Sequence, residues 1–240
     1  MIVKTLKEIV RQEISALFES AESDFEYVKE ARRVYNKIVK NINNINFVST
    51  SEEDFIKDTN GNAHRLYGVK FNLSQLDEKY DLDILLVHEL GMTSHHYSKN
   101  NNRIVFFILS QTNKEDFNHN LYLAKIRFHS WVEEPTFTHE FIHFLDSKRY
   151  SPTYKFSKPA ERTDYYNSPE EYNAFTQEII LNINKNKKQF QNITFKEFLK
   201  NALKKSNWEF VKKLNDAYKN KLVKRLYKIY TELNYNQTEK

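Results

Sequence analysis

The chain has 240 residues and a formal net charge of +5, enough for one large domain or a domain with an extension. It contains no cysteine, which excludes disulfide frameworks and cysteine-based zinc sites. Three glycines and four prolines are too few for a turn-rich all-β fold, whereas 18 Phe and 15 Tyr can fill a real core.

The N-terminus carries charges where a signal peptide needs an apolar run. No stretch approaches the roughly 20 apolar residues that span a bilayer. We therefore expect no signal peptide, no transmembrane segment and a soluble chain that is cytoplasmic as synthesised.

Residues 3–44 place apolar side chains at helical spacing, which predicts two helices broken near residues 20–23. The segments that follow, rich in β-branched and aromatic residues and separated by Asn, Asp and Gly, predict strands. These predicted strands cover residues 67–73, 82–90, 103–110 and 121–129.

Between the second and third predicted strands, the stretch Gly-Met-Thr-Ser-His-His-Tyr-Ser predicts a turn. Its two histidines, His95 and His96, are expected to be exposed loop residues. Residues 134–235 return to helical patterns, so the order of elements predicts an α+β fold with a mixed sheet.

Residues 139–143 form the pentapeptide His-Glu-Phe-Ile-His. On a helix, His139 and His143 lie one turn apart on the same face and can bind one Zn²⁺ from the same side. Glu140 points about a quarter turn away, near enough to accept a proton from a metal-activated water.

The surrounding residues support a helix with two distinct faces. Pro135 suits the first helical turn, and Glu133 complements its positive end. The aromatic side chains fall opposite the histidines and predict a core-facing side; they are Phe137, Phe141 and Phe144. The alternative is a polar helix face that happens to carry two histidines.

A catalytic zinc site needs a third protein ligand. Glu171 is a candidate because it begins a predicted helix capped by Ser168, with Pro169 at its first position. Ala174, one turn later, would allow close helix packing. The alternative is that Glu171 only completes a capping box with Ser168.

The segment His-Glu-Phe-Ile-His-Phe-Leu-Asp over 139–146, followed by Glu171-Tyr172-Asn173-Ala174, resembles the gluzincin metallopeptidases. It is similar to the catalytic domain of anthrax lethal factor and its bacterial relatives. The resemblance covers about residues 121–182. It implies a zincin-like fold, with His139, His143 and Glu171 as zinc ligands and Glu140 as general base.

Four further residues are candidates for supporting roles. Asp146 lies on the histidine face and could orient a ligand imidazole, act as a ligand itself, or simply end the helix. A tyrosine close before the ligand Glu steadies the oxyanion in many such enzymes, which points to Tyr165 or Tyr166. His129, at the end of the last predicted strand, could reach the substrate cleft, although a half-buried strand residue is the alternative.

Zincin folds commonly pair an extended substrate with an edge strand beside the active-site helix. The segment 103–110 is the candidate for that edge strand. Its unbroken apolar run is also typical of a buried central strand, so both interpretations are open.

Charge is unevenly distributed along the chain. Residues 185–228 contain fourteen Lys/Arg and three acids, a net of +11, which leaves −6 for the remainder. Such a region could contact nucleic acid, an acidic partner or an anionic surface, or be a solvated back face. No arginine cluster, zinc finger or RNP-type motif indicates specific nucleic-acid readout.

The sequence therefore predicts three regions: a helical N-terminal extension over 1–45, a zincin-like catalytic domain over 46–190, and basic C-terminal helices over 191–240 packed on it. The expected function is a zinc-dependent metallopeptidase acting on a protein or peptide. The alternative is a catalytically inactive module that contacts an acidic partner through the basic helices. An intact Glu140 favours the enzyme, because a binding module has no need of a general base.

Overall fold

The computed structural model describes residues 26–57, 63–88, 95–98, 100–109, 114–149, 165–203 and 205–235. Contacts divide the chain into two compact units, Ala31–Thr153 and a second made of Met1–Glu30 with Tyr154–Lys240. We call the first the sheet unit and the second the helical unit. A helix over residues 26–41 confirms part of the predicted N-terminal helices, and the rest of that prediction lies outside the described residues.

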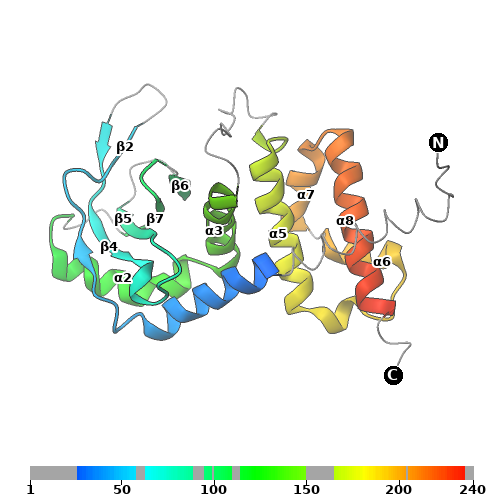
Figure 1. The fold of residues 1–240 in the computed structure, drawn as a ribbon, viewed down its shortest axis with the longest axis horizontal. Coiled ribbons are helices and arrows are strands. Elements are labelled where there is room, and N and C mark those ends of the chain that lie inside the picture. The colour runs from blue at the N-terminus through cyan, green and yellow to red at the C-terminus, as the bar shows by residue number, and fades with distance from the viewer. Residues whose placement is uncertain are drawn as a thin grey trace, which may run out of the picture. The chain divides into compact units, whose positions relative to one another are not determined.

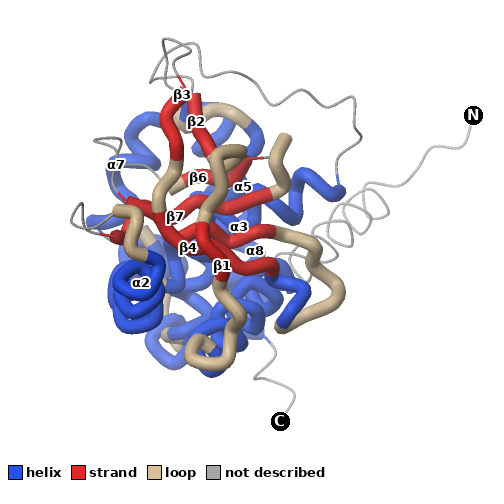
Figure 2. Tube along the Cα trace, turned by 90° about the vertical axis from the view of Figure 1, so that its left-hand side faces the viewer, coloured by secondary structure: helices blue, strands red, loops and turns tan. Residues whose placement is uncertain are grey.

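The sheet unit contains a five-stranded sheet in the order β1-β4-β5-β7-β6 (Figure 2). Its strands are β1 (Val48–Ser49), β4 (Gly68–Asn72), β5 (Asp83–His88), β7 (Arg103–Leu109) and β6 (His96–Ser98). The β5–β7 pair is parallel and the other neighbours are antiparallel. A separate hairpin pairs β2 (Phe55–Lys57) with β3 (Ala63–Arg65). The prediction of an α+β protein with a mixed sheet is confirmed.

Both faces of the sheet are covered, which explains why its central strands are apolar throughout. On one face, alternate residues such as Ile84, Phe106 and Ile108 pack against helix 26–41, α2 (Phe117–Trp131) and α3 (Glu134–Arg149). On the other face, residues including Leu85 and Val105 form a smaller cluster.

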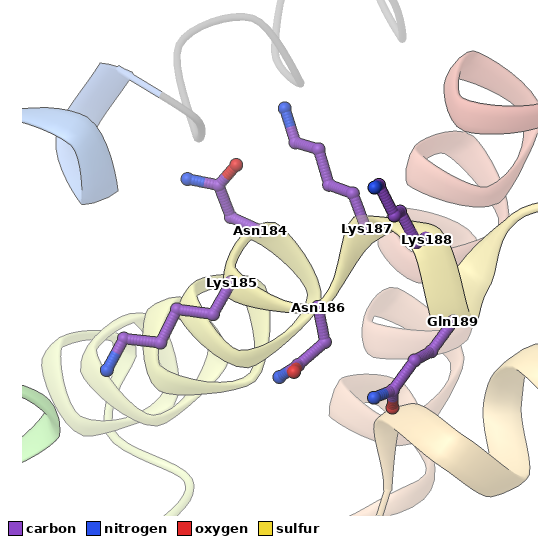
Figure 3. Close-up of a pocket in the computed structure, with 6 residues that line it drawn as sticks. All are labelled: Asn184, Lys185, Asn186, Lys187, Lys188 and Gln189. Atoms are coloured by element: carbon purple, nitrogen blue, oxygen red, sulfur yellow. The ribbon is translucent and has the colours of Figure 1, made fainter.

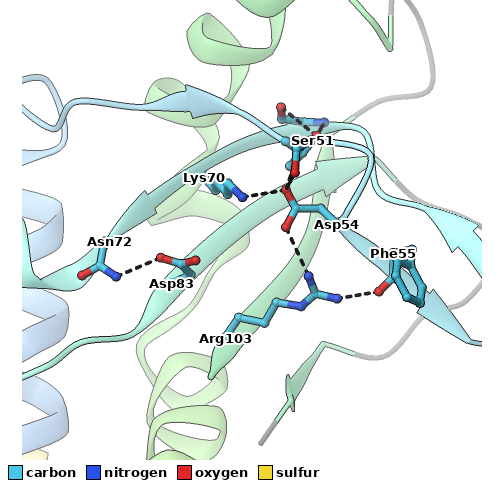
Figure 4. Close-up of polar contacts among 9 residues, drawn as sticks. Ser51, Asp54, Phe55, Lys70, Asn72, Asp83 and Arg103 are labelled. Carbon is cyan, nitrogen blue, oxygen red and sulfur yellow. Dashed lines mark hydrogen bonds and ion pairs between the residues drawn. The ribbon is translucent and has the colours of Figure 1, made fainter. Parts of the chain in front are cut away.

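A buried charge network fastens the segment before β2 to that second face (Figure 4). Asp54 bonds Lys70 of β4 at 2.7 Å and Arg103 of β7 at 3.2 Å, and Arg103 also donates to the carbonyl oxygen of Phe55. Burial raises the pKa of Asp54, but the hydrogen bonds from Lys70 and Ser51 outweigh it and hold that pKa below its usual value. The buried Asp54 carboxylate is therefore paired with two cationic side chains, as a buried carboxylate requires.

The predicted strand over 121–129 is wrong, because this segment lies inside α2. Asp116 caps the helix by accepting a hydrogen bond from the backbone N–H of His119 at 3.0 Å. Its buried residues recur at helical spacing; they are Asn120, Leu123, Ala124 and Phe128. The abundance of apolar and aromatic residues favoured a strand, but their period is that of a helix.

The sheet decides between the two interpretations of segment 103–110. β7 is paired on both sides, with β5 and with β6, so it is the buried central strand. Among the described strands the sheet ends at β1 and at β6, and β6 lies within the stretch that predicted a turn. His96 is part of that strand, and His95 beside it is half-buried, so the prediction of two exposed loop histidines is wrong.

The helical unit contains α5 (Pro169–Lys185), the short 3-10 helix η2 (Lys187–Phe190), α6 (Phe195–Ala202), α7 (Lys205–Lys213) and α8 (Asp216–Tyr235) (Figure 1). They enclose their own apolar core, which includes Phe190, Phe198, Leu222 and Leu226. A capping box formed by Thr194 and Glu197 starts α6. The helical spacing noted in the sequence therefore buries one face of each helix.

The division into units differs from the predicted domain boundaries. The boundary at Thr153 and Tyr154 falls before α5, so α5 groups with the C-terminal helices rather than with the strands. The reason is its apolar face, which packs on the helical core through residues such as Ile179 and Ile183. Among the described helices, none has the length and apolar character needed to cross a membrane.

Candidate metal centre

The rotation of α3 is set by its aromatic face. Phe137, Phe141 and Phe144 are buried in the core beneath the sheet. Phe141 packs edge-on against Tyr80 at 5.2 Å, and Phe137 stacks on Phe106 at 6.2 Å between ring centroids. Because these rings hold one side of the helix to the sheet, the histidines must project from another side, as predicted.

His139 and His143 bring their Nε2 atoms to 3.2 Å from each other. Their rings lie 4.9 Å apart at 76°, and the side chains are 9% and 8% exposed. Two Nε2–H groups cannot face each other at this distance, so at least one of these nitrogens presents a lone pair. The pair can therefore share a proton or turn two lone pairs toward one cation.

Two carboxylates accompany the histidines on α3. Glu140 is 7% exposed and Asp146 is 2% exposed, so both are among the buried polar residues of the chain. Buried carboxylates are costly unless they are engaged by charge or hydrogen bonds. Their burial distinguishes this helix from an ordinary amphipathic helix, whose acids face solvent.

Glu171 lies in the first turn of α5, in the helical unit. As predicted, Ser168 is the N-cap and Pro169 begins the helix, and the Ser168 hydroxyl accepts from the backbone N–H of Glu171 at 3.3 Å. A full capping box would need the Glu171 carboxylate to accept from the N–H of Ser168. That N–H instead donates to the carbonyl oxygen of Tyr165 at 3.2 Å. The capping-box alternative therefore does not account for the side chain of Glu171.

The two tyrosines differ in their surroundings. The ring of Tyr166 packs against Phe175 and Phe210 of the helical core and lies under the ammonium of Lys213 at 4.8 Å. Tyr165 contacts Tyr166 edge-on at 5.1 Å and is half-buried. Tyr166 is committed to the core, which leaves Tyr165 as the better candidate for contact with a substrate.

His129 is not on a strand but in the last turn of α2, where it is exposed. The predicted strand end at His129 is therefore wrong, and its reach into a substrate cleft stays a prediction.

The sequence patterns missed the contacts of the edge strand. The Tyr97 hydroxyl of β6 bonds the Ser147 hydroxyl of α3 at 2.8 Å, and the Tyr97 ring meets Phe144 at 6.0 Å. His95 accepts the backbone N–H of Phe107 at Nδ1 over 3.2 Å. The Tyr97 contacts bind β6 to the His-bearing helix, and the His95 contact binds the segment before β6 to β7. No local motif predicts the Tyr97–Ser147 bond, because it joins residues 50 positions apart.

Comparison with known proteins identifies no relative: no family model, curated protein or solved structure matches this chain.

Proposed function

We propose that the chain is a zinc-dependent metallopeptidase in which His139, His143 and Glu171 hold the metal. The imidazoles of His139 and His143 lie together on α3, and Glu171 is the carboxylate that the sequence pattern adds to them. Two imidazoles and one carboxylate are a ligand set that zinc hydrolases use, with the fourth position kept for water or substrate. A zincin-like fold and a relation to the gluzincins are part of the same proposal.

The observation that carries the proposal is the spacing of the two imidazole nitrogens. Zinc–nitrogen bonds of about 2.0–2.1 Å at tetrahedral angles place two ligand nitrogens about 3.3 Å apart. The Nε2 atoms of His139 and His143 lie 3.2 Å apart on a helix whose rotation is fixed by aromatic packing. The two side chains thus need little rearrangement to bind a single ion.

Glu171 is proposed as the third ligand on chemical grounds. It supplies the carboxylate that two histidines lack, and it begins a helix separate from α3, so it can approach from a third direction. Asp146 sits on the same helix one turn beyond His143, a direction already occupied by an imidazole. We therefore assign Asp146 to orienting a ligand imidazole.

When bound, Zn²⁺ supplies Lewis acidity that acidifies a water molecule and polarises the scissile carbonyl. Glu140 accepts the proton from that water while the oxygen of the water bonds to the carbonyl carbon of the substrate. As the carbon–nitrogen bond breaks, Glu140 returns the proton to the leaving amine. Tyr165 is the candidate donor to the oxyanion.

The substrate would lie as an extended chain beside β6, the edge strand that is bound to α3 through Tyr97 and Ser147. β6 is a terminal strand of the described sheet, and the outer edge of such a strand can pair with a peptide by strand addition. This assignment replaces β7, which has no open edge.

The decisive variant is Glu140→Gln, which keeps the size of the side chain but cannot accept a proton. We expect wild type to hydrolyse fluorescein-labelled casein or a quenched peptide library, and the variant to lose about 10²–10⁴-fold in rate. Zinc content should stay the same in both. Equal rates in the two proteins would place the base elsewhere, and absence of hydrolysis in zinc-loaded wild type would favour a binding function.

A further inference from the structure

The helical unit carries most of the positive charge of the chain. Residues 185–228 have fourteen Lys/Arg and three acids. The lysines are spread over η2, α6 and α8, where Lys188, Lys196 and Lys224 are exposed. Ring contacts and hydrogen bonds pack these three elements against one another, so their exposed lysines are carried by neighbouring elements.

A chain of ring contacts joins η2 to α6 and α6 to α8. Phe190 meets Phe198 at 5.2 Å, and Phe198 meets Tyr230 of α8 at 5.5 Å. The amide of Asn234 donates to the carbonyl oxygen of Phe190 at 3.3 Å and its oxygen accepts from the backbone N–H of Asn192 at 2.7 Å. These apolar rings therefore form a packed core between η2, α6 and α8, the three elements that carry the lysines.

The acids on these elements are fewer than the lysines; they are Glu197, Asp216 and Glu232. The Glu197 carboxylate accepts from the backbone N–H and the hydroxyl of Thr194, at 2.9 and 2.8 Å, as part of the capping box. Those hydrogen bonds, foremost that of the backbone, hold the pKa of Glu197 below its ordinary value. Asp216, at the start of α8, lies 3.8 Å from Lys219. Glu232 is the remaining acid of α8.

An exposed aromatic side chain lies within this surface. Tyr227 is 54% exposed, and its ring is held edge-on by Phe195 at 4.9 Å. Lys224 precedes it by about one helical turn, and Lys196 follows Phe195 in the chain. A large exposed ring held by a neighbouring ring, with lysines nearby in the sequence of both helices, is a platform for stacking a flat ligand.

A pocket at the end of α5 extends the same surface (Figure 3). It is lined by residues 184–189, which are three lysines, two asparagines and one glutamine, and none of them is acidic. Figure 3 shows the side chains diverging around the turn, with Asn184 and Lys187 extending to the same side. Such an open site, rich in hydrogen-bond donors, fits one segment of a long anion better than an enclosed small molecule.

We propose that the surface formed by η2, α6 and α8 binds single-stranded nucleic acid without sequence preference, lysines to phosphates and Tyr227 to a base. Protein partners fit less well, because lysine is depleted from the cores of protein interfaces. Membrane binding would need a broad apolar face, and the large apolar side chains exposed on the described part of this surface are Val223 and Tyr227.

The test is fluorescence anisotropy of the full chain with a labelled 20-nucleotide oligothymidylate at 50 and 200 mM NaCl. Three phosphate contacts predict a slope of log K against log salt near −2, so Kd should rise about 20-fold between the two salt concentrations. Lys188→Glu, Lys196→Glu and Lys224→Glu together should abolish binding. Lys40→Glu, an exposed lysine of helix 26–41, is the matched control and should bind as wild type does.

Substitutions of Tyr227 distinguish base stacking on its ring from attraction between lysines and phosphates. Tyr227→Ala should weaken binding about tenfold, whereas Tyr227→Phe keeps the ring and should bind as wild type does. Circular dichroism confirms that each variant is folded. The proposal is overturned if wild type fails to bind at 50 mM NaCl, if the triple variant binds normally, or if a polyglutamate peptide or phosphatidylserine vesicles bind more tightly than the oligonucleotide.

Discussion

At the scale of single residues, the proposed metal centre rests on two imidazole nitrogens that lie 3.2 Å apart. Their separation depends on helical spacing, but their burial depends on the aromatic side of α3. The rings of Phe137 and Phe141 hold that side against the sheet, so the histidines cannot rotate into solvent without losing core contacts. Because the two side chains are already ordered, binding an ion costs little conformational entropy.

The roles assigned to Glu171 and Asp146 can be separated by zinc titration. Glu171→Ala should cut zinc affinity severely and abolish activity, because two protein ligands remain. Asp146→Ala should cost about 10–100-fold, the usual effect of losing a partner that orients a ligand histidine. Glu133→Ala, at an exposed acid before α3, is the control and should match wild type. If Asp146→Ala loses the metal and Glu171→Ala keeps it, the two assignments are reversed.

A third buried histidine, His88, should make stability depend on pH. His88 is 1% exposed, its Nε2 lies 2.7 Å from the amide oxygen of Asn120, and burial lowers its pKa, with Lys114 and His119 adding to the effect. The unfolded chain then binds the proton more readily than the folded chain below pH of about 6.5. Its contribution to stability is present above that pH and is lost as the pH falls through the depressed pKa.

Urea unfolding at about pH 7.5 and pH 5.5 measures this effect. Wild type should lose more stability between the two pH values than His88→Gln, whose side chain does not titrate. The other histidines are common to both proteins and cancel in the comparison. An identical loss in the two proteins would mean that His88 takes no part in the pH dependence.

At the scale of elements, Gly68 marks a close approach between the backbones of β4 and β5. A Cβ at this position would lie 2.2 Å from the backbone carbonyl oxygen of Leu86 on the neighbouring strand, and the φ of +158° disfavours other residues. The clash is with backbone and cannot be relieved by turning a side chain.

Gly68→Ala should therefore lower the free energy of unfolding by at least about 1–3 kcal/mol, the usual cost of forcing atoms into a packed site. Urea titration monitored by circular dichroism measures it. Ala63→Gly, at an exposed position in β3, is a comparison that should cost under about 1 kcal/mol. A Gly68→Ala protein as stable as wild type would show that β4 and β5 can separate.

The elements also show where sequence patterns suffice. Strands β4, β5 and β7 were predictable because their runs of apolar residues are short and bounded by Asn, Asp and Gly. α2 was not, since Leu, Tyr, Ile and Phe dominate its middle and obscure the helical period. β6 was missed because three residues carry no periodicity, and its pairing with β7 depends on contacts distant in sequence.

The same difference between local patterns and distant contacts applies to the candidate site. The spacing of His139, Glu140 and His143 is local, so the sequence could place all three on one helix. Distant contacts could not be derived from local patterns, among them the bond from Tyr97 to Ser147 and the core packing of Tyr166. The pairing of β7 with both β5 and β6 changed the assigned edge strand, and the core packing of Tyr166 favoured Tyr165 for the proposed oxyanion role.

At the scale of the whole molecule, the two units differ in composition as well as in fold. The sheet unit carries the histidine pair on a helix packed beneath five strands, and the helical unit carries the excess of lysine. The proposed peptidase and the proposed nucleic-acid surface therefore rest on different residues. Removing either one by substitution should leave the other intact.

The most direct test of the proposed metal centre is the zinc content of the purified chain after reconstitution at about pH 7.5, measured by elemental analysis. We expect about one Zn²⁺ per chain in wild type, since two histidines and one carboxylate make a three-ligand site. His139→Ala and His143→Ala should lose most of it, whereas His129→Ala, an exposed histidine of α2, should retain it. Wild type without zinc, or His139→Ala with a full zinc content, would contradict the metal centre and the peptidase built on it.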